Sequence, residues 1–84
     1  MIRYDFVLHE TVFGDFLKTK GRDRIELTAA FSSLAHNPFV KGEYVERDAS
    51  GRPMQVKRFG KWMITFRADH GDCEVRIMTI DRID

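Results

Sequence analysis

The chain has 84 residues, a length that fits one domain and leaves no room for a second, so residues 1–84 are expected to form a single domain. Apolar residues make up 43% of the sequence and charged residues 32%, which is typical of a folded domain and excludes a disordered tail. Fourteen Lys and Arg against thirteen Asp and Glu give a net charge of +1. The overall charge therefore does not indicate a nucleic-acid-binding protein.

Cysteine use and hydropathy bear on the compartment. Cys73 is the single cysteine, so no internal disulfide can form, and a cytoplasmic protein is expected. No apolar run approaches the roughly 18 residues of a membrane-spanning helix. Charges at Arg3 and Asp5 come too early for a signal peptide. Neither membrane insertion nor secretion is expected.

A strand and a short helix are predicted at the start of the chain. Over residues 2–8 apolar residues first alternate and then run together, as in a strand that is buried on at least one face. Over residues 10–20 they return at helical spacing, and Gly21 is expected to stop that helix.

A second helix follows and ends at a proline. The stretch from Asp23 to Glu26 is a variant of the capping box, so the helix is expected to start there. Apolar residues continue at helical spacing until Pro38 keeps Asn37 out of helical dihedral angles. The helix should therefore end at His36 or Asn37.

Turn signals recur in the second half of the chain and predict an antiparallel meander. Strands are expected near residues 43–48, 53–59, 61–68 and 73–81. The order of one strand, two helices and four strands indicates an α+β domain with its helices packed on one face of the sheet.

The last two strands give the expected register of the sheet. With His70 and Gly71 as a two-residue loop, one face of the sheet is apolar and the other is mixed. The predicted pairs are Phe66 with Val75, Ile64 with Ile77, Ala68 with Cys73, Met63 with Met78, Thr65 with Arg76 and Arg67 with Glu74. The helices should cover the apolar face. The other face stays open to solvent or to a partner, with Met63, Met78 and Ile80 as its apolar members.

Basic residues gather in the middle of this meander. Five basic residues and no acidic one lie between positions 49 and 68, namely Arg52, Lys57, Arg58, Lys61 and Arg67. Cations on an open sheet face match phosphate oxygens. Arg52, Lys61 and Arg76 are therefore candidate RNA contacts. The alternative is a solvated hairpin whose bases pair with the flanking acids, Arg67 with Glu74 being the obvious pair.

The loop before the only tryptophan has two possible forms. If Gly60 and Lys61 form a two-residue loop, Lys57 points to the apolar side of the sheet, where a buried lysine is unfavourable. A bulge at Lys57 and Arg58, or a three-residue loop, removes that conflict and places Met54 and Val56 in the core.

Three stretches of the chain carry a family resemblance. They are the helical hairpin that ends in Leu34 to Pro38, the stretch from Val56 to Phe66, and the stretch from Val75 to Arg82. Together with the first strand they are similar to the RelE/ParE superfamily of bacterial toxins from type II toxin-antitoxin modules. The resemblance covers nearly the whole chain. It implies a RelE/ParE-like fold and a cognate antitoxin that binds across the open face.

The resemblance also implies an activity. Nuclease members of the superfamily cleave mRNA on the ribosome without a metal: the 2′-hydroxyl attacks the adjacent phosphate, and cations stabilise the charge that builds on phosphorus. Lys57 and Arg58 match the bases before the glycine turn, and Arg82 matches a C-terminal arginine, so these three are the implied catalytic residues. Trp62 matches the aromatic residue after the turn. No cofactor is implied.

Two departures from the family pattern leave other activities open. Met63 stands where the family has an arginine, and the sequence ends at Asp84 without the later tyrosine. A ParE-like toxin that inhibits gyrase suits these departures. So does a degenerate relative that only binds a protein partner.

No general base is evident in the sequence. Lys57 qualifies only with a depressed pKa. His36 is expected to serve at a helix end and His70 in a turn, while His9 has no assigned role. Residues 69–74 include metal-ligand types, but on one tight turn their side chains should diverge, so no metal site is expected.

Overall fold

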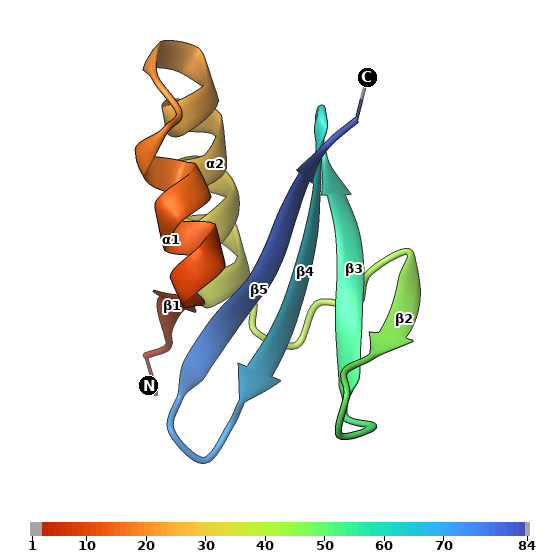
Figure 1. Ribbon diagram of the computed structural model, residues 1–84. Helices are drawn as coiled ribbons and strands as arrows, with labels where there is room; N and C mark the ends of the chain where they lie inside the picture. The colour runs from red at the N-terminus through yellow and green to blue at the C-terminus, as the bar shows by residue number, and fades with distance from the viewer. Residues whose placement is uncertain (1–2, 84) are drawn as a thin grey trace.

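The computed structural model describes residues 3–83 as two helices beside one curved sheet (Figure 1). In chain order the elements are β1 (Asp5–Leu8), α1 (Glu10–Leu17), α2 (Gly21–His36), β2 (Tyr44–Arg47), β3 (Pro53–Phe59), β4 (Trp62–Asp69) and β5 (Glu74–Arg82). The α+β class and the predicted order of elements are confirmed. Ile2, part of the predicted first strand, lies outside the described residues.

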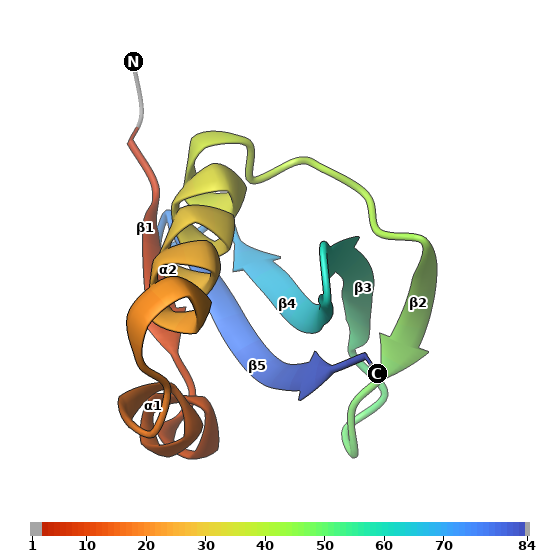
Figure 2. The same cartoon turned by 90° about the horizontal axis from the view of Figure 1, so that it is seen from above.

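All five strands belong to one sheet, in the order β1-β5-β4-β3-β2. β1 pairs with β5 in parallel and every other pair is antiparallel, so the sheet is mixed. The parallel pair joins the first and last strands, because the long connection between them lets β1 lie beside β5 in the same direction. Seen from above, the sheet curves strongly, with the helices beside β1 and β5 and with β2 at the far edge (Figure 2).

Both helices pack on one face of the sheet, as the sequence predicts. The core residues of that layer are Val12, Leu27, Ala30, Phe31, Leu34, Trp62, Ile64, Phe66, Val75, Ile77 and Ile80. We call this side the helix face and the other side the open face. The helices contact β1 and β5 and do not extend over β2 and β3 (Figure 2). Neither described helix is long and apolar enough to cross a membrane.

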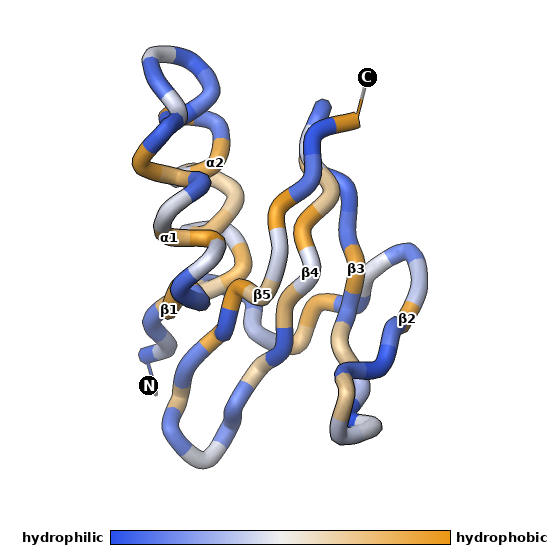
Figure 3. The backbone as a smooth tube through the Cα atoms, viewed as in Figure 1, coloured by the Kyte–Doolittle hydropathy of each residue, from blue (hydrophilic) through white to orange (hydrophobic). Residues whose placement is uncertain are grey.

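Hydropathy follows this layering. Hydrophobic and hydrophilic residues alternate along the helices and along β3, β4 and β5, while the loop between β4 and β5 is hydrophilic to neutral (Figure 3). Functional polar groups are therefore to be sought at the ends of the sheet and on the open face.

The start of α2 differs from the prediction. α1 already ends at Leu17, and Gly21 opens α2 with a φ of 56° instead of stopping α1. Asp23 thus lies inside the first turn of α2 and does not cap it. The capping-box prediction is wrong because Asp23 has partners elsewhere in the fold, Lys61 and Arg82, that local spacing does not reveal.

The register between β4 and β5 also differs from the prediction. Four residues, His70–Cys73, connect the strands. The observed pairs are Trp62 with Arg82, Met63 with Asp81, Ile64 with Ile80, Thr65 with Thr79, Phe66 with Ile77, Arg67 with Arg76, Ala68 with Val75 and Asp69 with Glu74. Met78 is left over as a bulge, which returns Ile80 to the helix face, where it is 9% exposed. Ile80 therefore belongs to the core, and its predicted place on the open face is wrong.

A two-residue turn connects β3 and β4. Gly60 and Lys61 form it, which places Lys57 opposite Ile64 on the helix face. Lys57 is only half-buried there because the helices do not extend over β3. The predicted bulge and the three-residue loop are both wrong, and Val56 lies on the open face instead of the helix-covered core.

Candidate functional site

The sequence-predicted site residues lie at the two ends of the sheet. β3 ends, β4 begins and β5 ends beside residues 60–61, and we call this the turn end; the β2–β3 turn and the β4–β5 loop lie at the opposite, loop end (Figure 1). Lys57, Arg58, Lys61 and Arg82 lie at the turn end, whereas Arg52 and Arg76 lie at the loop end. The three predicted catalytic residues thus share one end of the molecule but not one face.

Lys57 and Arg58 follow one another on β3, so their side chains point to opposite faces. Arg58 is exposed on the open face, where its Nε donates to the carbonyl oxygen of Gly60 at 2.8 Å. The Lys57 Nζ lies 5.8 Å from the centre of the Phe59 ring on the helix face. Neither base forms an ion pair with any residue from 3 to 83. Within residues 3–83 no direct ion pair therefore neutralises either charge, although both act on the carboxylate of Glu43.

Glu43, just before β2, is held beside these two bases. Its Oε2 accepts a hydrogen bond from the Arg58 backbone N–H at 2.9 Å, and its own N–H donates to the Val56 carbonyl at 2.8 Å. The Arg58 N–H lowers the pKa of Glu43, and the charges of Lys57 and Arg58 lower it further. A carboxylate with a lowered pKa is a weak proton acceptor, so Glu43 suits the fastening of β3 better than the role of general base.

Asp23 of α2 joins two predicted site residues from distant parts of the chain. The Lys61 Nζ contacts Asp23 Oδ1, and the Arg82 Nη1 lies 3.3 Å from Asp23 Oδ2. Glu26 Oε2 lies 3.8 Å from the same ammonium. The hydrogen bond from Lys61 lowers the pKa of Asp23, with help from the charges of Lys61 and Arg82. Two carboxylates therefore offset the charges of Lys61 and Arg82, a role for Asp23 and Glu26 that the sequence interpretation missed.

The aromatic residue after the turn is part of the core. Trp62 is 7% exposed and packs in the helix-face cluster. The guanidinium of Arg82 lies 6.0 Å from its ring centre, as their direct pairing across β4 and β5 requires. Trp62 therefore supports Arg82 and offers no free face for stacking a base. Met63, where the family pattern has an arginine, lies opposite Arg58 on the open face.

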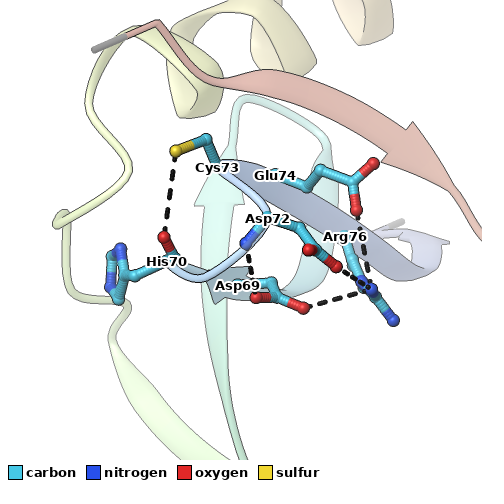
Figure 4. Close-up of polar contacts among 6 residues, drawn as sticks. All are labelled: Asp69, His70, Asp72, Cys73, Glu74 and Arg76. Atoms are coloured by element: carbon cyan, nitrogen blue, oxygen red, sulfur yellow. Dashed lines mark hydrogen bonds and ion pairs between the residues drawn. The ribbon is translucent and has the colours of Figure 1, made fainter.

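Arg76 at the loop end is enclosed by carboxylates. Its Nη2 lies 3.1 Å from Asp69, 3.4 Å from Asp72 and 3.5 Å from Glu74 (Figure 4). These acids converge on one guanidinium, so the prediction that side chains of this turn diverge is wrong. The predicted pair of Arg67 with Glu74 is also wrong, because Arg67 lies opposite Arg76. In residues 3–83 no group of three His, Cys, Asp or Glu side chains is placed to hold a metal.

Arg52 lies in the turn between β2 and β3, far from the turn end. Its backbone N–H donates to Asp48 Oδ1 at 2.8 Å, and its side chain forms no ion pair with the described residues. The basic residues of this stretch thus differ in whether a carboxylate pairs with them. Lys61 pairs with Asp23 and Glu26 of α2, not with the flanking acids that the solvated-hairpin alternative named. Lys57, Arg58 and Arg52 form no direct ion pair within residues 3–83.

The three histidines all have local structural contacts. His9 caps the N-terminus of α1 through its side chain. His36 Nδ1 donates to the Ser32 carbonyl at 2.9 Å near the end of α2, as its predicted helix-end role requires. His70 lies in the β4–β5 loop, and its Nδ1 is 2.7 Å from the hydroxyl of Tyr4, which precedes β1. None of these hydrogen bonds involves a predicted catalytic residue.

Comparison with solved structures identifies known proteins with the same fold. No family model matches the chain, and no curated protein matches it. Solved structures do match, each over 96% of this chain. A chain of the toxin-antitoxin complex RelBE2 from Mycobacterium tuberculosis has a TM-score of 0.77 at 21% identity, with 99% of that chain covered. A chain of the archaeal RelE-RelB complex from Pyrococcus horikoshii OT3 has a TM-score of 0.73 at 11% identity, with 96% covered. The isolated E. coli RelE toxin has a TM-score of 0.68 at 11% identity, with 85% covered. The protein has the RelE toxin fold.

Proposed function

We propose that this protein is the toxin of a toxin-antitoxin pair and that it inhibits translation by cleaving mRNA on the ribosome. The RelE fold over nearly the whole chain supports the class of protein. The observation that carries the activity is the presence of two cations, Lys57 and Arg58, that form no ion pair among the described residues and lie at the same end of the sheet as Arg82. In this proposal residues 1–84 work as one toxin domain in the cytoplasm.

The chemistry assigned to this end is attack of an RNA 2′-hydroxyl on its neighbouring phosphate. A P–O bond forms to the 2′-oxygen, whose proton passes to solvent water, and the bond to the 5′-oxygen of the next nucleotide breaks. The leaving 5′-oxygen takes up a proton from water, so the products are a 2′,3′-cyclic phosphate and a 5′-hydroxyl. Arg58 binds the oxygens of the reacting phosphate and stabilises the charge that builds there, while Lys57, on the opposite face of the same strand, binds the next phosphate of the RNA. Arg82 is supported by Trp62 and held by Asp23, so it adds a positioned donor. Arg52, Lys61 and Arg76 remain candidate contacts to more distant RNA phosphates.

A protein partner is part of the proposal. The matching structures from M. tuberculosis and P. horikoshii are complexes that contain an antitoxin. Met63 and Met78 are half-buried residues of β4 and β5, with Met63 on the open face. We expect a cognate antitoxin to cover the open face. Co-expression with the product of the neighbouring gene should then raise the yield of soluble protein.

Cleavage in a translating extract tests the activity. The wild-type protein should cut ribosome-bound mRNA, as mapped by primer extension, and the Lys57→Ala and Arg58→Ala variants should each be roughly 100-fold slower. Arg22→Ala is the matched control, since Arg22 is exposed on α2 and takes no part in the proposed site. Intact mRNA with the wild-type protein, at concentrations that arrest growth, would refute the nuclease proposal.

A non-catalytic toxin is the second candidate, and two observations favour it. Met63 leaves the open face beside Arg58 without the arginine of the family pattern. Carboxylates also offset the charges of Lys61, Arg82 and Arg76. Inhibited DNA supercoiling with intact mRNA would identify a gyrase-binding toxin. Antitoxin binding without either effect would identify a degenerate member that only binds a protein.

A further inference from the structure

A groove lies between α2 and the turn end, on the part of the helix face that the helices leave uncovered. It has a volume of about 450 Å³. Its lining residues come from one side of α2 and from the turn, namely Glu26, Ala29, Ala30, Ser33, Phe59, Gly60 and Lys61. The groove exists because α2 contacts β1 and β5 and does not reach β3, where Phe59 is half-buried.

The walls of this groove are apolar, and its edge carries both signs of charge: Lys61 is paired with Asp23 and with Glu26, which also lines the groove, whereas Lys57 forms no ion pair in residues 3–83. The ring of Phe59 forms one wall, and Ala29 and Ala30 form the other. Lys61 is part of the lining, and the Lys57 ammonium lies beside the Phe59 ring without an ion-pair partner in residues 3–83. Proteins bind single-stranded nucleic acids by placing bases on aromatic rings and phosphates on nearby cations, and the half-buried ring of Phe59 with the Lys57 ammonium beside it offers both.

We infer that this groove binds one nucleobase of single-stranded RNA, packed against Phe59, with the adjacent phosphate on Lys57. The inference rests on the proposed function and specifies where the RNA strand passes. It places part of the RNA contact on the helix face, whereas the sequence had pointed to the open face alone.

Charge and continuity favour RNA over an apolar protein segment as the occupant. The Lys57 ammonium, which forms no ion pair in residues 3–83, is complementary to an anion, and every nucleotide carries one next to its base. Lys57 is followed by Arg58, which presents its charge on the other face of the same strand end. A strand that leaves the groove therefore reaches the proposed catalytic cations by crossing the turn end.

Groove-filling variants on α2 test this inference. Ala29 and Ser33 are exposed residues that line the groove, so Ala29→Leu and Ser33→Leu fill it without entering the core. Thr28→Leu is the matched control, because Thr28 is exposed on the same helix and does not line the groove. Binding of a fluorescent single-stranded RNA hexamer is measured without ribosomes, after circular dichroism shows that all four proteins are folded.

Wild type and Thr28→Leu should bind the hexamer equally, and both groove-filling variants should bind roughly tenfold more weakly or worse. Amide shifts in NMR spectra should change at residues 29, 33 and 60 when RNA is added. Three results would overturn the inference: no binding by wild type, equal binding by all four proteins, or shifts confined to the open face. Loss of antitoxin binding in Ala29→Leu with unchanged RNA affinity would also overturn it, by assigning the groove to a protein.

The measurement separates this inference from the proposed function. If the wild-type protein binds the hexamer through the groove but cuts no mRNA, the nuclease proposal is refuted and the groove inference stands. If the wild-type protein cuts mRNA and both groove-filling variants bind RNA as tightly as wild type, the nuclease proposal stands and the groove inference is refuted.

Discussion

Both ends of the sheet carry basic and acidic side chains, but they leave different charges available. At the loop end Arg76 meets three carboxylates from its own hairpin, so its charge is fully offset. At the turn end Lys57 and Arg58 form no ion pair with residues 3–83, while Lys61 and Arg82 share Asp23 of α2. The difference arises because the β4–β5 hairpin supplies the acids that pair with Arg76, whereas the acids that pair with Lys61 and Arg82 come from α2. Clustering of charges in a sequence therefore does not predict which charges remain free.

The largest effect is expected where β2 closes against β3 beside the turn end. A Cβ on Gly42 would lie 2.2 Å from the Val56 carbonyl oxygen, so Gly42→Ala must push the segment before β2 away from β3. This shift also breaks the hold of Glu43 on Arg58. We expect a loss of about 3 kcal/mol in the free energy of unfolding. Urea unfolding measures it.

Gly14→Ala in α1 is the matched control, because nothing lies within 4 Å of its Cβ position. It should raise the free energy of unfolding by about 0.5 to 1 kcal/mol. A Gly42→Ala protein as stable as wild type would show that β2 does not depend on this close approach.

Acidic pH should lower the stability of the protein through carboxylates at both ends of the sheet. Hydrogen bonds lower the pKa of four carboxyls: Lys61 donates to Asp23, the Arg58 N–H to Glu43, the Ser50 hydroxyl to Asp48 and the Asp72 N–H to Asp69. The unfolded chain therefore binds protons more readily than the folded protein. The stability that these carboxylates contribute is complete above their ordinary pKa values and is lost as the pH falls through the lowered ones.

The urea midpoint should therefore fall steadily between about pH 5 and pH 2. Asp23→Asn and Asp69→Asn remove one such group from the turn end and from the loop end, so each variant should show a shallower fall than wild type. A midpoint that stays constant down to pH 3 would contradict the lowered pKa values.

A smaller effect tests the contact between Asp23 and Arg82. Unfolding of Asp23→Asn, Arg82→Gln and the double variant forms a double-mutant cycle. The double variant should lose less stability than the two single variants together, because each removes the same contact. Asp15→Asn, an exposed acid of α1, combined with Arg82→Gln should be additive. If the stability losses of Asp23→Asn and Arg82→Gln also add up in the double variant, the side chain of Asp23 does not hold Arg82.

Much of the fold could be predicted from the sequence because its signals are local. Pro38 ends α2 and turn residues separate the strands of the meander, so the element order needs no tertiary information. The register of β5 depends instead on the bulge at Met78, which local alternation does not reveal. This single residue moved Ile80 from the open face to the core.

The candidate site was predictable only in part, for a related reason. The adjacency of Lys57 and Arg58 on β3 is a local property and is read directly from the chain. The sharing of Asp23 by Lys61 and Arg82 depends on contacts across 38 and 59 residues, which spacing does not encode. The sequence pattern therefore predicted Asp23 as a helix cap, whereas in the fold Asp23 forms ion pairs with Lys61 and Arg82.

Comparison of two arginine variants is the most direct test of the central claim that free charge at the turn end drives RNA cleavage. Arg58→Gln and Arg76→Gln each remove one arginine, at the turn end and at the loop end of the open face. In ribosome-dependent mRNA cleavage, Arg58→Gln should be roughly 100-fold slower than wild type and Arg76→Gln less than about tenfold slower. Equal losses, or a larger loss for Arg76→Gln, would contradict the claim.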